Sequence, residues 1–302
     1  MKGAFKMQKK ISISSGRPQL KYGTKEALRI CKEAGFDGVD FSLDSFGWGG
    51  QPDVVTMPYD EFVAHFKDLR AYADEIGIDI PTAHSLVYSY GTDEEKNEKY
   101  RQKAIRDIEA CSILGAKYCV IHSVGTGPYG FDTPMEVMHE KNQRMYSDFI
   151  ATAEKFKVCI TLESFGSTKS NGVSGYDHFA NHEAMLYEYE SLPTEYKAFC
   201  LDSGHTNLGV NGGFLSVPDF IRYFGSRIKM LHLHDNNGFS DQHLIPAQGN
   251  IDWPAVFDAL DEIGYDGYYN YELAPKYGDS LKDGIMFLGK LLREFTDKRG
   301  KI

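Results

Sequence analysis

The sequence predicts one α/β domain folded as a single (β/α)8 barrel, and three observations support this. Eight short apolar runs alternate with longer segments of helical periodicity along the whole 302-residue chain. A segment made of a helix end, a glycine, a two-residue turn and a strand start occurs at 33–40 and 262–269, with a looser copy at 113–118. No change in composition marks a second domain, so residues 1–302 are expected to form one domain with a flexible N-terminus over 1–9. An open, doubly wound sheet is the alternative.

Each barrel strand is expected where a short apolar run, rich in β-branched and aromatic residues, is bounded by turn residues. In chain order these runs are 10–15, 38–43, 78–84, 117–123, 158–164, 197–203, 228–234 and 267–273. Helices are expected between them, because apolar side chains recur there every three or four residues, as at Tyr100, Ala104 and Ile108. The helical segments are 24–34, 59–75, 94–114, 134–156, 181–190, 217–224, 253–262 and 280–297.

Composition and charge are those of a soluble globular protein, with 42% hydrophobic and 25% charged residues. The chain has no apolar run of about 18 residues and its first ten residues lack an apolar signal core, so we expect a cytoplasmic protein without a membrane partner. The five scattered cysteines are typical of reduced, buried thiols. A net charge of −10 disfavours nucleic acid as a partner, because such binding depends on neutralising phosphates.

Ligand-type side chains stand at the ends of six of the eight expected strands. They are His84, His122, Glu163, Asp202 with His205, His232 with His234, and Glu272. All lie at the carboxyl ends of the strands, where barrel enzymes build their active sites, so we expect them to converge on one mouth. Carboxylates brought together there would repel one another by about 4 kcal/mol per pair at roughly 4 Å. A divalent metal would relieve this repulsion, and carboxylates with imidazoles suit manganese, magnesium, cobalt or zinc; protonated carboxylates are the alternative.

Two stretches of the chain resemble a known family. Residues 201–207, LDSGHTN, are similar to the Asp-x-Gly-His-x-Asn motif of the xylose isomerase-like TIM barrels, the sugar isomerase and epimerase superfamily that also includes endonuclease IV. Residues 228–236, IKMLHLHDN, resemble the His-Leu-Lys-Asp motif of that family, and residues 241–253 resemble its following turn. The resemblance covers nearly the whole chain and implies the TIM barrel fold, but it does not specify the substrate.

The resemblance implies one divalent metal ion with four protein ligands, which are Glu163, Asp202, His232 and Glu272. It also places His205 beside the metal as a substrate contact with a catalytic part. Because Glu163 and Glu272 stand opposite each other in strand order, we expect them to be the acid and base of the reaction.

Further candidates surround this expected metal centre. The substrate-binding candidates are His84, His122, His205, His234 and Trp48. His234 stands where the family usually has lysine. Asp241 and His243 are expected either to hold a second metal or to brace the first through hydrogen bonds.

The interpretation that we favour is a metal-dependent sugar isomerase or epimerase. It would remove a proton next to a carbonyl, through an enediolate, from a small ketose, a cyclitol or a related polyol. The loops at 44–50, 88–91, 127–131 and 176–179 are acidic, glycine-rich and aromatic, which suits an uncharged sugar better than DNA. We therefore expect a small-molecule sugar as the partner and no nucleic acid, and we leave open whether the chain forms a homo-oligomer.

Two alternatives stay open. Endonuclease IV binds three zinc ions through nine ligands, and this chain has a residue at each matching position: His84, His122, Glu163, Asp202, His205, His232, Asp241, His243 and Glu272. A metal-dependent phosphodiesterase is therefore the first alternative. The second is a dehydratase or lyase that acts on an oxidised sugar through the same enolate chemistry.

Overall fold

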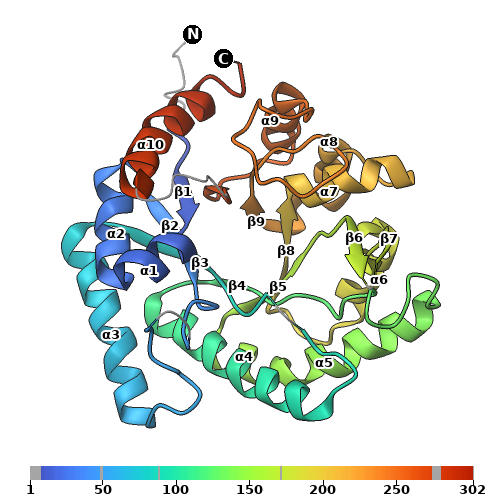
Figure 1. Ribbon diagram of the computed structural model, residues 1–302, viewed down its shortest axis with the longest axis horizontal. Coiled ribbons are helices and arrows are strands. Elements are labelled where there is room, and N and C mark those ends of the chain that lie inside the picture. The colour runs from blue at the N-terminus through green and yellow to red at the C-terminus, as the bar shows by residue number, and fades with distance from the viewer. Residues whose placement is uncertain (1–7, 48–49, 88, 171, 274–279, 302) are drawn as a thin grey trace.

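The computed structural model of the protein describes residues 8–47, 50–87, 89–170, 172–273 and 280–301. It confirms the expected single (β/α)8 TIM barrel: Figure 1 shows a ring of strands surrounded by helices. Of the expected flexible N-terminus, residues 1–7 lie outside the described residues, whereas the ammonium of Lys9 donates a hydrogen bond of 2.7 Å to Asp261.

All eight expected strands are present, and all their pairings are parallel. They are β1 (Ile11–Ser14), β2 (Gly38–Ser42), β3 (Asp79–His84), β4 (Tyr118–Val120), β5 (Cys159–Glu163), β8 (Lys197–Asp202), β9 (Ile228–His232) and β10 (Tyr269–Tyr271). They pair in the order β10-β1-β2-β3-β4-β5-β8-β9. The ring closes between β9 and β10, where Leu233 bridges to Tyr271 and its amide donates to the carbonyl of Asn270 at 2.8 Å.

The eight expected helices are also confirmed, with ends that differ by one residue at most. They are α2 (Thr24–Glu33), α3 (Tyr59–Ile76), α4 (Glu94–Leu114), α5 (Met135–Phe156), α6 (His182–Ser191), α8 (Val217–Phe224), α9 (Trp253–Glu262) and α10 (Leu281–Asp297). The repeated glycine stands after the end of three helices, as expected. Gly35, Gly115 and Gly264 have φ of +91°, +83° and +68°, a left-handed conformation that favours glycine.

Several short elements were not predicted. They are α1 (Gly16–Tyr22), the hairpin strands β6 (Ser167–Ser170) and β7 (Val173–Tyr176), α7 (Ser203–Gly209), and the 3-10 turns η1 (His178–Ala180), η2 (Val210–Gly212) and η3 (Gly225–Arg227). Helices of seven residues are too short to show periodicity, and the hairpin sequence is largely polar. Figure 1 shows β6 and β7 outside the ring of barrel strands, where they form a sheet of their own.

The barrel strands alternate between an outer apolar face and an inner face that is largely polar. Outward side chains such as Val39, Phe41 and Leu231 belong to the main hydrophobic core beneath the helices. Inside the ring, Ser12 donates to Asn270 at 3.0 Å and Thr82 donates to Asp40 at 2.8 Å. The strand faces that end in ligand-type residues therefore run through a polar interior.

All five cysteines are free thiols, of which four are buried and Cys159 is half-buried. Among the described residues, no helix combines the length and the apolar character that crossing a membrane would require.

The loop between β9 and α9 carries Asp241 and His243, and the buried carboxylate of Asp235 holds it in shape. One oxygen accepts hydrogen bonds from the amides of Asn236 and Ile251 at 2.9 and 3.3 Å. The other accepts from the amide of Ala247 and the indole of Trp253, both at 2.9 Å. Four donors spread over 18 residues thus converge on one side chain, which is fully buried.

We predict that Asp235→Asn lowers the free energy of unfolding by about 2–4 kcal/mol, because an amide nitrogen would face two donors and leave them unpaired. Urea denaturation followed by circular dichroism measures this change. The matched control is Asp252→Asn, because Asp252 is the exposed N-cap of α9 and asparagine caps helices equally well. A wild-type unfolding energy for Asp235→Asn would contradict the clamp role of this carboxylate.

Candidate active site

The carboxyl ends of the barrel strands bring four of the expected residues together. Glu163 ends β5, Asp202 ends β8, His232 ends β9 and Glu272 follows β10. One ligand-type atom from each of these side chains lies within 4.8 Å of the others. The geometry meets the requirement for a divalent-metal site, since carboxylate oxygens and an imidazole nitrogen are common metal ligands.

His232 is the centre of this group. Its Nδ1 lies 2.6 Å from Oε1 of Glu163 and 3.1 Å from Oε2 of Glu272. Glu163 is 1% exposed and His232 is fully buried, whereas the side chain of Glu272 is 26% exposed. Glu272 is therefore the carboxylate of the pair with the more open path to solvent.

The protonation of these groups reflects their mutual contacts. Burial alone would raise the pKa of Glu163, but the charge of His232 and contacts with His122 hold it well below its usual value. Burial would likewise raise the pKa of Glu272, but the charge of His232 and the contact with it lower this pKa. Burial opposes the protonation of His232, yet its anionic neighbours raise its pKa well above the usual value. The site therefore stabilises ionised carboxylates and positive charge among them.

His84 and His122 lie beside Glu163 on the next strands of the ring. The Nε2 of His122 lies 2.9 Å from Oε2 of Glu163, and that of His84 lies 3.7 Å from it. The two imidazoles meet with their Nε2 atoms 3.2 Å apart. Their Nδ1 atoms contact the backbone carbonyls of Ser85 and Val87 at 2.8 and 2.9 Å, which fixes both rings.

A second group of ligand-type side chains adjoins the first on the side of Asp202. It contains His205, His234, Asp241 and His243, again with ligand-type atoms within 4.8 Å of one another. Oδ2 of Asp241 lies 3.5 Å from Nε2 of His205 and 3.1 Å from Nε2 of His243. Their hydrogen bonds lower the pKa of Asp241 against the effect of burial, and that of His243 is raised to about 9, again against burial.

His234 connects the two groups. It is fully buried, and its Nε2 lies 2.9 and 3.1 Å from the two oxygens of Asp202. Its ring stacks on that of His243 with centroids 3.9 Å apart and planes 6° apart. His243 has a φ of +46°, a strained value for a residue other than glycine, so the loop places this ring at an energetic cost.

Buried atoms without partners test whether a cation fits the first group. Nδ1 of His234 is buried and makes no hydrogen bond within the described residues, whereas the buried Oε2 of Glu163 and Nε2 of His232 each have a close polar neighbour, His122 at 2.9 Å and Asp40 at 3.4 Å. Buried polar atoms are normally paired, and a lone pair left free among carboxylates and imidazoles is available to a metal ion. The cluster is thus consistent with a divalent metal.

Two neighbours of the cluster were not among the predicted site residues. Asp40, on β2, has Oδ2 3.4 Å from Nε2 of His232. Phe165 stacks on His205 at 5.1 Å and packs edge-on against His122 at 4.9 Å. Asp40 lies two residues before the end of its strand, and Phe165 follows Glu163 by two residues, so neither stands at a strand end, where the ligand-type residues were sought. Trp48 lies outside the described residues.

The carboxyl end of the barrel holds an open cavity of about 280 Å³. Its lining includes Asp40, His84, His243 and Glu272, together with Arg17. Glu272 is the expected acid or base that faces this space. The cavity therefore gives a small molecule access to the edge of the ligand cluster.

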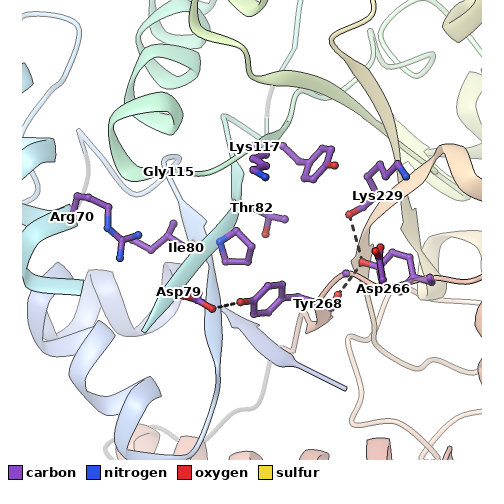
Figure 2. Close-up of a pocket in the computed structure, with 13 residues that line it drawn as sticks. Arg70, Asp79, Ile80, Thr82, Gly115, Lys117, Lys229, Asp266 and Tyr268 are labelled. Carbon is purple, nitrogen blue, oxygen red and sulfur yellow. Dashed lines mark hydrogen bonds between the residues drawn. The ribbon is translucent and has the colours of Figure 1, made fainter. Parts of the chain in front are cut away.

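Another cavity, of about 500 Å³, is drawn in Figure 2 and lies at the amino ends of the strands. Asp79 begins β3, and Tyr268 precedes β10; the Tyr268 hydroxyl donates a hydrogen bond to Asp79 across the cavity. None of its described lining residues is an expected site residue. In TIM barrels this end contributes to stability while the chemistry occurs at the other end, so we place the function at the smaller cavity.

Comparison with known proteins gives relatives of several kinds. An uncharacterized protein of Methanocaldococcus jannaschii is 29% identical over 204 residues, which is 67% of this chain and 64%, just under two thirds, of that protein. A fructoselysine 3-epimerase of Shigella flexneri is 23% identical over 261 residues, covering 84% of this chain and 86% of the enzyme.

Solved structures share the fold. A crystal structure of a protein named IOLI with a bound zinc atom has a TM-score of 0.75 at 20% identity, covering 97% of this chain and all of that one. The family model described as xylose isomerase-like TIM barrel matches residues 28–291, which is most of the chain. The protein therefore belongs to the xylose isomerase-like TIM barrel family.

Proposed function

We propose that the protein is a metal-dependent sugar isomerase or epimerase that acts on a ketose, a cyclitol or a related polyol. One observation carries the proposal: two glutamates, Glu163 and Glu272, flank the same imidazole nitrogen beside a cavity of about 280 Å³. Two carboxyl groups at one site, one ionised to accept a proton and one protonated to return a proton, are what a proton transfer between two faces or two carbons of a sugar requires. A relative that is named a sugar epimerase, and matches most of this chain, supports this reaction class.

The metal would be held by Glu163, Asp202, His232 and Glu272. A divalent ion bound there supplies Lewis acidity that polarises a carbonyl and acidifies the neighbouring C–H bond. One ligand-type atom from each of these four side chains lies within 4.8 Å of the others, which supports this assignment. Manganese, magnesium, cobalt and zinc all suit such a ligand set.

The protein side chains would carry out the proton transfer. One of the two glutamates removes the proton next to the carbonyl to give an enediolate, and the other returns a proton to the opposite face or to the next carbon. The lowered pKa values of Glu163 and Glu272 favour the ionised form, which accepts a proton; the glutamate that acts as the acid takes up a proton from solvent before it returns one. Glu272 lines the cavity, so we assign it the direct contact with the reacting carbon.

The surrounding residues would bind and orient the sugar. His205, stacked on Phe165, would hold a substrate oxygen, and His84 and His122 would bind hydroxyls or relay a proton. Trp48, which lies outside the described residues, is retained as a proposed substrate contact. His234 would position the carboxylate of Asp202, because its ring is fully buried and its Nε2 contacts both carboxylate oxygens.

A nuclease-like function is the second candidate, because the chain has a residue at each of the nine ligand positions named above. Three of these residues, His205, Asp241 and His243, lie in the second group, which could hold a further metal. We propose instead that Asp241 and His243 brace the site, since Nδ1 of His243 lies 3.1 Å from the carbonyl of Glu272. The net charge of −10 also disfavours binding to DNA. Elimination on an oxidised sugar would use the same pair of glutamates.

We predict that Glu272→Gln lowers kcat by about 10²–10⁴-fold, because the amide cannot accept the proton, and that Glu163→Gln does the same. Hydrogen exchange of a panel of ketoses, keto-inositols and oxidised glycosides in deuterated water, followed by NMR, measures turnover and identifies the exchanging carbon. Glu154→Gln, on the exposed face of α5, is the matched control. Folded, metal-loaded variants with wild-type turnover would remove the acid and base assignment.

We expect one divalent ion per chain after reconstitution, measured by elemental mass spectrometry. Asp202→Asn should lose the ion, because Asp202 belongs to the first group, whereas His243→Gln should retain it. Circular dichroism checks that both variants fold. More than one ion in the wild type, with one fewer in His243→Gln, would favour the nuclease-like cluster.

We predict that the protein cleaves a DNA duplex with an abasic site no faster than free metal ions do. The reasons are that the cavity at the barrel mouth has the size of a small polyol and that the acidic chain repels DNA. Gel analysis of an end-labelled duplex in the presence of the reconstituted protein is the measurement. Cleavage with multiple turnovers, lost in Glu163→Gln, would replace the isomerase proposal by the phosphodiesterase.

A further inference from the structure

The carboxyl end of the barrel holds a second cavity, of about 510 Å³, beside the cavity of about 280 Å³ that Glu272 lines. It is distinct from the cavity at the amino ends of the strands. The two cavities share Val87 as a common wall. His84 lines the first and His122 lines the second, and their Nε2 atoms lie 3.2 Å apart. A molecule bound at the glutamates could therefore extend past Val87 into the larger space.

The unpredicted hairpin builds one wall of this second cavity. Thr168, Lys169 and Ser170 of β6 line it, and β6 and β7 stand outside the repeating βα pattern of the barrel. The hairpin packs closely on the loop after β4: a Cβ added at Gly127 would lie 2.7 Å from Cβ of Ser170, and one at Gly175 would lie 2.2 Å from the ring of Phe131. The wall is therefore held in place before any ligand binds.

The lining has several residues with hydroxyl side chains and one cationic side chain, Lys169, which suits a group that carries many hydroxyls. The lining includes four residues with hydroxyl side chains, Ser89, Ser123, Thr168 and Ser170, together with the aromatic residues Tyr90 and Phe165. Hydroxyl groups next to aromatic faces are the chemistry that binds a sugar ring, which has polar edges and apolar C–H faces. The one carboxylate in the lining, Asp177, is already engaged, since it accepts hydrogen bonds from the amides of Thr126 and Phe179 at 3.0 and 3.1 Å.

Ser123 gives the second, independent sign of a ligand. Its side chain is 3% exposed, and its hydroxyl makes no hydrogen bond within the described residues. Unpaired buried hydroxyls are unusual, because the folded protein loses the hydrogen bonds that water would provide. Ser123 lines the cavity, so a hydroxyl group bound there would pair with this oxygen once the side chain rotates toward it.

We propose that the substrate is a glycosylated sugar rather than a free monosaccharide. Its reacting carbonyl unit lies in the cavity beside Glu272, and a second sugar ring lies between Phe165 and the β6–β7 hairpin. This inference rests on the proposed function for the reacting end, but it concerns different residues. A free ketose would fill the first cavity and leave the larger one, with the Ser123 hydroxyl, without a partner.

The test compares D-fructose with two of its glucosides, maltulose and isomaltulose, on the metal-loaded protein. Calorimetry measures binding, and NMR in deuterated water measures C–H exchange. We expect both glucosides to bind at least tenfold more tightly than D-fructose. A variant that fills the second cavity tests the location of the second sugar ring.

Thr168→Trp, which fills this cavity, should abolish the preference for the glucosides without changing the binding of D-fructose. Val173→Trp is the matched control, because Val173 is an exposed residue of the same hairpin and does not line the cavity.

A second variant addresses the unpaired hydroxyl. Ser123→Ala should weaken glucoside binding severalfold while the thermal midpoint stays equal or rises, because the variant removes an unsatisfied buried group. A purely structural serine would instead lower the midpoint and leave the preference between the two sugars unchanged.

The outcomes separate this inference from the proposed function. Equal binding of D-fructose and its glucosides, or binding of neither, overturns the inference, even where exchange at a sugar carbon supports the isomerase. Preferential binding of the glucosides that Thr168→Trp abolishes supports the second subsite, even where no C–H exchange occurs and the proposed reaction is wrong.

Discussion

The site depends on one electrostatic constraint, the burial of the Glu163 carboxylate at the centre of the barrel mouth. With 1% exposure this carboxylate receives almost no stabilisation from water, so positive or hydrogen-bonding groups must surround it. Three imidazoles from three other strands do so, at 2.6 Å for His232, 2.9 Å for His122 and 3.7 Å for His84. The same arrangement gathers free lone pairs around one point, which is the condition for a metal site. The stabilisation of a buried carboxylate and the binding of a metal ion therefore require the same arrangement of these residues.

The parts of the chain outside the regular barrel shape how that centre is reached. The loop after β9 is held by the four hydrogen bonds that converge on Asp235, and it holds His243 in a strained conformation against the ring of His234. The β6–β7 hairpin extends the mouth on the side of His122. The barrel strands thus carry the cluster of ligand-type residues, whereas these two additions shape the space beside it.

Much of the fold could be predicted from local patterns. All eight barrel strands and the eight helices between and after them were located, because apolar periodicity and glycine stops are properties of neighbouring residues. Ligand-type residues at six strand ends could be placed together because the strand ends of a parallel barrel face one way, whereas the choice of Glu163, Asp202, His232 and Glu272 among them came from the resemblance to the family. The hairpin, α1 and α7 escaped prediction, since each is too short or too polar to leave a periodic signal. Asp40 and Phe165 were missed because their role depends on contacts with His232 and with two histidines from other strands.

The sequence by itself determined the fold class and the set of ligand-type residues at one end of the barrel, because both follow from the order of residues along single strands. Only the tertiary structure decided how those residues divide into groups. It showed that His234 contacts Asp202 and His243 and does not face the cavity. It also showed that Glu272 is the more exposed of the two glutamates and that a second cavity lies beside the first. Distances between side chains 30 or more positions apart depend on the twist and closure of the whole sheet, which no local pattern records.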